Sequence, residues 1–330
     1  MDPKLEELNR EVARLSREGQ YREVEPLLLK VLDLTREEYG EDDPEYATIL
    51  NDLGALYRAT GEYGKSESSF LQAMKVIGRV RGEEHPDYAT CVNNLAGLYR
   101  LTGDYSKAEQ LFLQAWDIYA KTLGEEHFLF ASNLNNLALL YQDMGDYDKA
   151  EGLQLRALDI GRRTRGENDV AYATSLCNLA ATYTAKGDLQ KAGDALEQAL
   201  DVYAATVGTE HPLYASALNN LAGLHYARGE YGEAEQRYLQ VLQVCDSIWG
   251  AEHPNYASAL SSLAAVYETS GDVVKAEQSY RRSLDIRRRV LGEQHPDYVD
   301  NVDNLAALYE RTGDVAKARE LRGHSKEAEQ

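Results

Sequence analysis

The chain has 330 residues, 43% of them hydrophobic, and a formal net charge of −20. With only 7 prolines and no low-complexity tract, this composition excludes a disordered or linker-rich chain and allows a sizeable core. Acidic residues outnumber basic ones in both halves of the chain, which argues against partners that present phosphates, such as nucleic acid or an anionic membrane.

The first segment, residues 1–19, is typical of a polar amphipathic helix that caps one end of a helical fold. It has no apolar core of the kind found in a signal peptide, and no run in the chain approaches membrane-spanning length. The three cysteines, Cys91, Cys177 and Cys245, form no CxxC pair. The sequence therefore predicts reduced thiols and a cytoplasmic protein.

Two series of glycines divide the rest of the chain with a constant period of 42 residues. The first is Gly40, Gly82, Gly124, Gly166, Gly208, Gly250 and Gly292, and the second is Gly19, Gly61, Gly103, Gly145, Gly187, Gly229, Gly271 and Gly313. A glycine just after a helix supplies the left-handed conformation that ends it. The series predict about eight antiparallel helix hairpins, the last of them shortened.

Residues 83–124 represent one such unit. Helix A is predicted to begin at His85-Pro86-Asp87, because proline suits the first helical turn and an acidic residue complements the helix dipole. The apolar stripe of helix A is Val92, Leu95, Ala96, Leu98 and Tyr99, and that of helix B is Tyr105, Ala108, Leu111, Phe112, Ala115, Trp116 and Ile118. Since one hairpin cannot bury both stripes, neighbouring hairpins must stack into an all-α solenoid with a concave and a convex face.

The motif L-A-x-L-Y-x-x-x-G-x-Y-x-x-A-E runs from Leu95 to Glu109, and recurs as LALLYQDMGDYDKAE at 137–151 and LAAVYETSGDVVKAEQ at 263–278. It resembles the tetratricopeptide repeat. The period, the LNNLA core and the LGEEHPDYA-like junctions resemble the repeats of kinesin light chain and its bacterial relatives, over roughly residues 5–322. The resemblance implies a right-handed superhelix and a peptide- or protein-binding adaptor. No heptad coiled coil like that of kinesin light chain is found, so a motor subunit is not expected.

The resemblance also implies that the polar arc of each helix A lines the concave groove. The predicted partner-binding residues are Asn51, Arg58, Asn93, Asn94, Arg100, Asn135, Asn136, Gln142, Asn178, Asn219, Asn220 and Tyr226. Amides offer both a donor and an acceptor, which suits the backbone of an extended peptide. The alternative is that these asparagines bond to neighbouring A helices and keep the shape of the groove.

The same face is predicted to carry a charge gradient. Its basic residues are Arg10, Arg17, Arg58 and Arg100, and its acidic residues are Glu268, Asp300, Asp303 and Glu310. This arrangement favours a partner that is acidic toward the amino-terminal half of the groove. The alternative is that these charges are ordinary solvated side chains.

Other recurring residues are assigned to architecture. One slot holds His85, His127, His211, His253 and His295, or Asp43 and Asp169, which favours helix capping over metal binding, because residues one repeat apart cannot share a zinc ion. The series Tyr46, Tyr88, Phe130, Tyr172, Tyr214, Tyr256 and Tyr298 is expected to pack at hairpin junctions. His225 replaces the motif's tyrosine and is expected in the core or at the groove edge.

We expect one solenoid domain over residues 1–330, with repeating helices over 20–313 and a shortened helix with a polar tail over 314–330. The stretch Gly145–Gly208 is the least regular, since Gly152, Gly161 and Gly193 interrupt helix B patterns. Bending is predicted to concentrate there.

No nucleotide-binding, zinc-protease or nucleophile-elbow motif occurs, so no catalytic residue, cofactor or metal is predicted. The predicted function is a non-catalytic interaction scaffold or adaptor that binds a peptide or extended segment in the concave groove. The alternative is a regulatory subunit that docks a folded effector enzyme through convex or edge surfaces. The sequence leaves the partner and the oligomeric state open.

Overall fold

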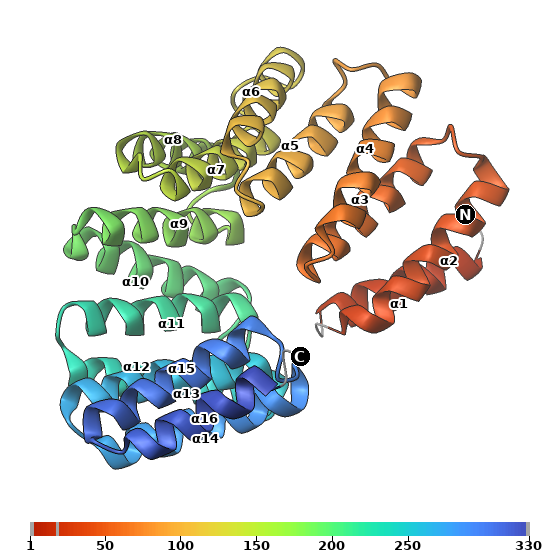
Figure 1. Cartoon of the computed structure of the whole chain (residues 1–330). Coiled ribbons are helices and arrows are strands. Elements are labelled where there is room, and N and C mark those ends of the chain that lie inside the picture. Colours follow the sequence, from red (N-terminus) through yellow and green to blue (C-terminus); the bar gives the residue numbers. More distant parts are fainter. Residues whose placement is uncertain (1–2, 18–19, 328–330) are drawn as a thin grey trace. The chain divides into compact units, whose positions relative to one another are not determined.

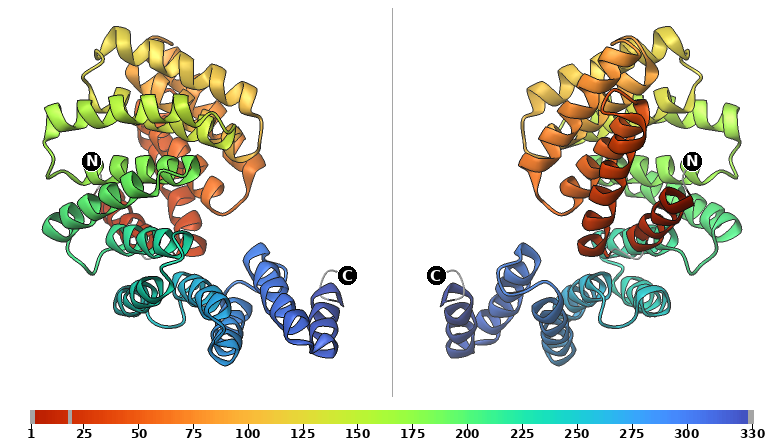
Figure 2. Two further views of the ribbon diagram at one scale, coloured as in Figure 1. Left: turned by 90° about the vertical axis from the view of Figure 1, so that its left-hand side faces the viewer. Right: turned by 90° about the vertical axis from the view of Figure 1, so that its right-hand side faces the viewer.

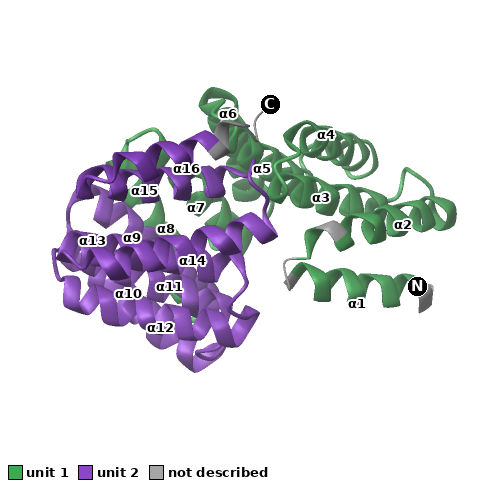
Figure 3. Cartoon of the chain, turned by 60° about the horizontal axis from the view of Figure 1, so that its bottom comes forward, with its two compact units in different colours: residues 1–166 green, residues 167–330 purple. Residues whose placement is uncertain are grey.

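The computed structural model describes residues 3–17 and 20–327, in which all regular secondary structure is helical (Figure 1). The chain divides into two compact units, residues 1–166 and 167–330 (Figure 3). The predicted all-α solenoid of tandem hairpins is confirmed. The boundary at Gly166 falls inside the stretch Gly145–Gly208, and a single continuous domain over residues 1–330 stays a prediction.

The described residues form sixteen helices, eight in each unit. In unit 1 they are α1 (Pro3–Arg17), α2 (Tyr21–Tyr39), α3 (Pro44–Ala59), α4 (Tyr63–Val80), α5 (Pro86–Leu101), α6 (Tyr105–Thr122), α7 (Phe128–Asp143) and α8 (Tyr147–Arg165). In unit 2 they are α9 (Val170–Lys186), α10 (Leu189–Thr206), α11 (Pro212–Ala227), α12 (Tyr231–Trp249), α13 (Pro254–Ser270), α14 (Val273–Val290), α15 (Pro296–Thr312) and α16 (Val315–Glu327).

The helices begin and end where the sequence predicts. Every described glycine of the two series has a positive φ, between 76° and 89°, which glycine adopts without strain. Gly19 lies outside the described residues. Before α5, the His85 Nδ1 accepts a hydrogen bond from the Asp87 backbone N–H at 3.1 Å. The same cap precedes α7, α11, α13 and α15, and aspartate supplies it before α3 and α9, so the predicted capping role is confirmed.

The predicted stripes form the core. Val92 and Ala96 of α5 and Phe112 of α6 are fully buried, and the Trp116 ring meets the Phe130 ring edge-on with centroids 5.0 Å apart. Phe130 is fully buried and packs with α5 and α6, as expected for the aromatic series at the hairpin junctions. Burying an aromatic ring of this size removes a large apolar area from water and stabilises the stack.

A second recurring cluster joins consecutive hairpins. The Tyr99 hydroxyl donates to Glu67 of the preceding hairpin at 2.5 Å, and the Lys107 ammonium lies 4.9 Å from the centroid of the Tyr99 ring. One repeat later, Glu109 accepts from the Tyr141 hydroxyl at 2.6 Å. The tyrosine, lysine and glutamate of the sequence motif are therefore architectural residues.

Within each unit, consecutive hairpins lie side by side (Figures 1 and 2). The odd-numbered helices also contact one another, α3 with α5 and α5 with α7 in unit 1, and α9 with α11 and α11 with α13 in unit 2. The crowding of odd-numbered helices places them on the inner side of each curved stack. They line its concave face, and the even-numbered helices form the convex side.

Candidate functional site

The asparagines of unit 1 are linked in a ladder along the concave face. The Asn94 amide donates to the Asn51 carbonyl oxygen at 2.9 Å, which ties α5 to α3. One step further, the Asn93 oxygen accepts from Asn136 at 3.2 Å and from the buried Asn133 at 3.1 Å. In unit 1 these asparagines hold neighbouring A helices together.

Arg58 is different, because it has no carboxylate partner among the described residues. Its side chain is half-buried on α3, and its guanidinium reaches over α5, where a Cβ on Gly97 would lie only 2.9 Å from Nη1. Burial, and then the nearby positive charge of Arg100, lower the pKa of Arg58. A cation in such a place is stabilised by an incoming anion.

Of the neighbouring arginines in unit 1, Arg100 and Arg10 bond within the chain. Arg100 is half-buried and pairs with Asp143 of the next hairpin at 2.5 Å. Asn135 and Gln142 lie half-buried on α7. Arg10 is exposed and donates to the backbone of its own helix, and the Arg17 side chain lies outside the described residues.

The predicted residues of unit 2 lie on α9 and α11. Asn178 is half-buried on α9. Asn219 and Asn220 lie on α11, the first half-buried and the second exposed, and neither side chain has a hydrogen-bond partner among the described residues. The Tyr226 hydroxyl lies 2.9 Å from the Thr269 hydroxyl of α13.

Most of the acidic residues predicted for the carboxy-terminal part of the groove are neutralised by arginines. Glu268 forms an ion pair with Arg311, and Arg322 pairs with both Asp303 and Glu310. The predicted gradient is thus weakened at its acidic end, and Arg58 is left as a half-buried cation with no carboxylate partner among the described residues.

The replacement of the motif's tyrosine by His225 is explained by the residues around it. In this repeat, glycine stands at position 193 where the architectural cluster has a glutamate, and the Arg228 guanidinium fills that space, donating to the Leu189 carbonyl oxygen at 2.6 Å. His225 is half-buried and its Nδ1 lies 2.6 Å from Glu230. The changes at positions 193 and 225 therefore occur together, across one junction between hairpins.

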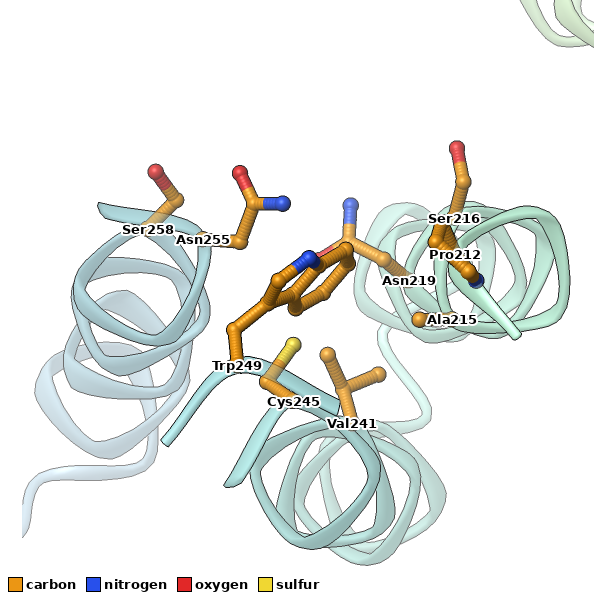
Figure 4. A pocket seen from close by; sticks show the side chains of 9 residues that line it. All are labelled: Pro212, Ala215, Ser216, Asn219, Val241, Cys245, Trp249, Asn255 and Ser258. Atoms are coloured by element: carbon orange, nitrogen blue, oxygen red, sulfur yellow. The ribbon is translucent and has the colours of Figure 1, made fainter. Parts of the chain in front are cut away.

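Sequence reasoning missed a pocket of about 190 Å³ between α11, α12 and α13. Figure 4 shows the amides of Asn219 and Asn255 and two serine hydroxyls around its mouth, with Cys245 and Val241 at its floor. The Trp249 indole forms a wall and stacks on His253, with ring centroids 5.0 Å apart. Most other repeats have no aromatic residue in the slot of Trp249. This departure from the repeat is the sequence signal that could have indicated the pocket.

The remaining chemistry of the described residues is sparse. Burial raises the pKa of Cys245 and that of Cys177 to about 11, and that of Cys91 to about 12, so these thiols are protonated at neutral pH. No group of histidine, cysteine and acidic side chains in the described residues is arranged to hold a metal ion. None of the described helices is long and apolar enough to cross a membrane.

Comparison with known proteins gives one family and several similar folds. The tetratricopeptide repeat model matches residues 13–77, 48–121, 129–205, 176–247, 213–288 and 255–325. No curated protein matches the chain. A putative kinesin light chain from Podospora anserina, with nearly identical TPR-like repeats, is 29% identical with a TM-score of 0.54; the match covers 62% of this chain and 98% of that one.

BtubC (BKLC) from P. vanneervenii is 25% identical with a TM-score of 0.57, over 70% of this chain and 90% of that one. RapI in its apo form, at 17% identity and a TM-score of 0.61, covers 87% of this chain and 99% of its own, and shows the fold alone. The structural neighbours are kinesin light chain-like repeat proteins, and such proteins are generally non-catalytic interaction scaffolds. Since the family model matches most of its length, the chain belongs to the tetratricopeptide repeat family.

Proposed function

We propose that this chain is a non-catalytic adaptor that holds an extended segment of a partner protein on its concave face, with a carboxylate of that segment bound to Arg58. The observation that carries the proposal is the half-buried guanidinium of Arg58, which has no acidic partner among the described residues. In a chain with a net charge of −20, a cation that is half-buried and yet unpaired with the chain's own carboxylates is unusual.

The geometry around Arg58 suits a carboxylate. A guanidinium binds a carboxylate through two parallel hydrogen bonds, and such charge-assisted bonds are stronger where water is partly excluded. The nearby Arg100 is already paired with Asp143 and adds a positive field without competing for the ligand. Because residue 97 is glycine, no side chain crowds the Arg58 guanidinium at this point.

Other features support the setting of this function. The asparagine ladder in unit 1 gives a rigid floor, so little ordering accompanies binding. The three cysteines are free thiols, which supports a reducing compartment, the cytoplasm, as the place of action. The overall negative charge supports a protein partner over a nucleic acid or an anionic membrane.

The test compares two arginine variants of equal charge. Wild type, Arg58→Gln and Arg36→Gln are used to capture partners from a lysate of the source organism, and the affinity of each captured protein is then measured. Arg36 is an exposed arginine on α2 that pairs with Asp33 at 2.9 Å. Arg58→Gln should weaken binding about ten- to hundredfold, as expected for loss of a charge-assisted bond. A partner held equally by both variants would contradict binding at Arg58.

A second candidate function, docking of a folded effector enzyme on the convex side, is favoured by one observation. A leucine occupies the same position on each even-numbered helix of unit 1, and each is 42–47% exposed: Leu29, Leu71, Leu113 and Leu155. Exposed apolar side chains that recur on one face are typical of a docking surface. A partner lost by the Leu71→Gln and Leu113→Gln double variant, but held by Arg58→Gln, would support this candidate over the adaptor.

A further inference from the structure

The pocket of unit 2 lies where two other hairpins place a tyrosine ring of their own. In α6 the ring of Tyr119 fills the space beside α5, and its hydroxyl lies 2.9 Å from Thr90. Tyr203 of α10 does the same against Thr174 at 2.8 Å. Both tyrosines are only 2% exposed. This space between helices A and B is therefore shaped for a six-membered ring.

In the hairpin α11–α12 the same slot holds Cys245, three repeats after Tyr119, and the opposite slot holds Ser216. One repeat later the slot is filled again, because Arg287 reaches Ser258 with Nη2 at 3.2 Å. The small thiol thus leaves the ring space vacant in α11–α12, and the pocket of about 190 Å³ is found there.

The chemistry of the pocket changes with depth. Its floor is apolar, with Val241, Ala215 and Cys245 all buried, and burial raises the pKa of the Cys245 thiol to about 11, which keeps it neutral. Its mouth is polar, with the unpartnered amides of Asn219 and Asn255 among the described residues (Figure 4). The Trp249 indole forms an aromatic wall, and its position is fixed by stacking on His253, which caps α13.

We propose that this pocket binds a phenylalanine side chain from the partner segment, with the amides of Asn219 and Asn255 bonding to the backbone on either side of it. The inference deepens the proposed function and rests on it for the source of the phenylalanine. A ring that enters from the mouth meets the Trp249 indole edge-on or offset and contacts only apolar groups at the floor. The amides at the mouth offer both a donor and an acceptor to an extended backbone.

The change from a polar mouth to an apolar floor also determines which aromatic side chain the pocket accepts. A tyrosine entering from the mouth would push its hydroxyl against Val241 and the neutral thiol of Cys245, where it finds no good partner, and a buried unpaired hydroxyl is unfavourable. The chain's own tyrosines avoid this difficulty because they enter from helix B and direct the hydroxyl to the polar mouth. The pocket therefore selects phenylalanine over tyrosine in a ligand.

The experiment uses the full chain and three peptides, Ac-Gly-Ser-Phe-Ser-Gly-NH2 and the same sequence with Tyr or Leu in the centre. The chain has 2 tryptophans, so Trp116→Phe leaves Trp249 as the single fluorescent reporter. The indole N–H signals of the unsubstituted chain in NMR give the same readout without that change. We expect the Phe peptide to saturate the Trp249 signal with a Kd on the order of 1 mM, and the Tyr peptide to bind at least fivefold more weakly.

Two variants test the location. Cys245→Tyr fills the space from within and should weaken the Phe peptide at least tenfold, with a melting temperature no lower than that of the parent. Asn219→Ala should weaken the Phe and Tyr peptides by the same factor. No saturable signal, equal binding of Phe and Tyr peptides, or unchanged binding to Cys245→Tyr would each overturn the proposal.

Failure of the adaptor function gives a different result. Arg58→Gln leaves the pocket untouched, so the Phe peptide should bind this variant as it binds the parent. A captured partner that depends on Arg58 and binds Cys245→Tyr as tightly as wild type would overturn the phenylalanine site and leave the adaptor function standing. Peptide binding that is lost in Cys245→Tyr, with no partner sensitive to Arg58, would support the pocket and contradict the carboxylate site.

Discussion

In unit 1 the oxygen of Asn93 accepts two hydrogen bonds from α7, whereas in unit 2 the residue in the same slot, Asn219, has no partner among the described residues and stands at the mouth of a pocket. Asparagines in the same repeat slot thus have different roles in the two units. The amides of Asn93 and Asn136 in unit 1 are used within the chain, and the amide of Asn219 in unit 2 is available to a ligand.

The hairpins α5–α6 and α11–α12 differ in the same way. In α5–α6 the recurring cluster is complete, with Tyr99 bonded to a glutamate and covered by Lys107. In α11–α12 the tyrosine is replaced by His225, the lysine by Glu233 and the ring beside helix A by Cys245. Departures from the repeat concentrate where a pocket forms. In a repeat protein, a residue that breaks the period is therefore a better guide to a binding site than one that follows it.

The strongest test of this contrast converts the regular hairpin into the irregular one. Tyr119→Cys removes a buried ring and its hydroxyl contact with Thr90, and should lower the free energy of unfolding by about 2–4 kcal/mol. Urea denaturation followed by circular dichroism measures the loss. The reciprocal change, Cys245→Tyr, should not destabilise the chain. Equal losses from both substitutions would show that the two slots are not equivalent.

A smaller effect distinguishes the two asparagines. Asn93→Ala removes the acceptor of two hydrogen bonds, one of them from the buried Asn133, and should cost about 1–2 kcal/mol of stability. Asn219→Ala should change stability by less than about 0.5 kcal/mol, since no bond within the described chain is lost. Thermal unfolding of the two variants side by side makes the comparison. If Asn219→Ala proves as costly as Asn93→Ala, the amide of Asn219 is structural and not reserved for a ligand.

The architecture of the chain could be predicted from its sequence, but the pocket could not. The period of 42 predicted the helices, the caps at His85 and its equivalents, and the core around Phe112, because these follow from local backbone chemistry and apolar spacing. The predicted asparagines lie on odd-numbered helices, but the bonds between these helices depend on distances between hairpins, which the spacing of residues in the sequence does not contain. The pocket was missed because it arises from a missing ring at Cys245, and an absence is visible only against the filled slots of other repeats.

The smallest expected effect concerns two glycines inside helices of the irregular stretch. A Cβ on Gly152 would meet nothing within 4 Å, so Gly152→Ala should stabilise the chain by about 0.5–1 kcal/mol through helix propensity alone. A Cβ on Gly193 would lie 2.7 Å from Nη2 of Arg228, and moving that guanidinium breaks its bond to the Leu189 carbonyl oxygen. Gly193→Ala should therefore fall short of Gly152→Ala by about 1 kcal/mol, the value of one such bond. Melting curves of both variants measure the difference, and equal stabilisation would mean that position 193 is glycine for a reason other than Arg228.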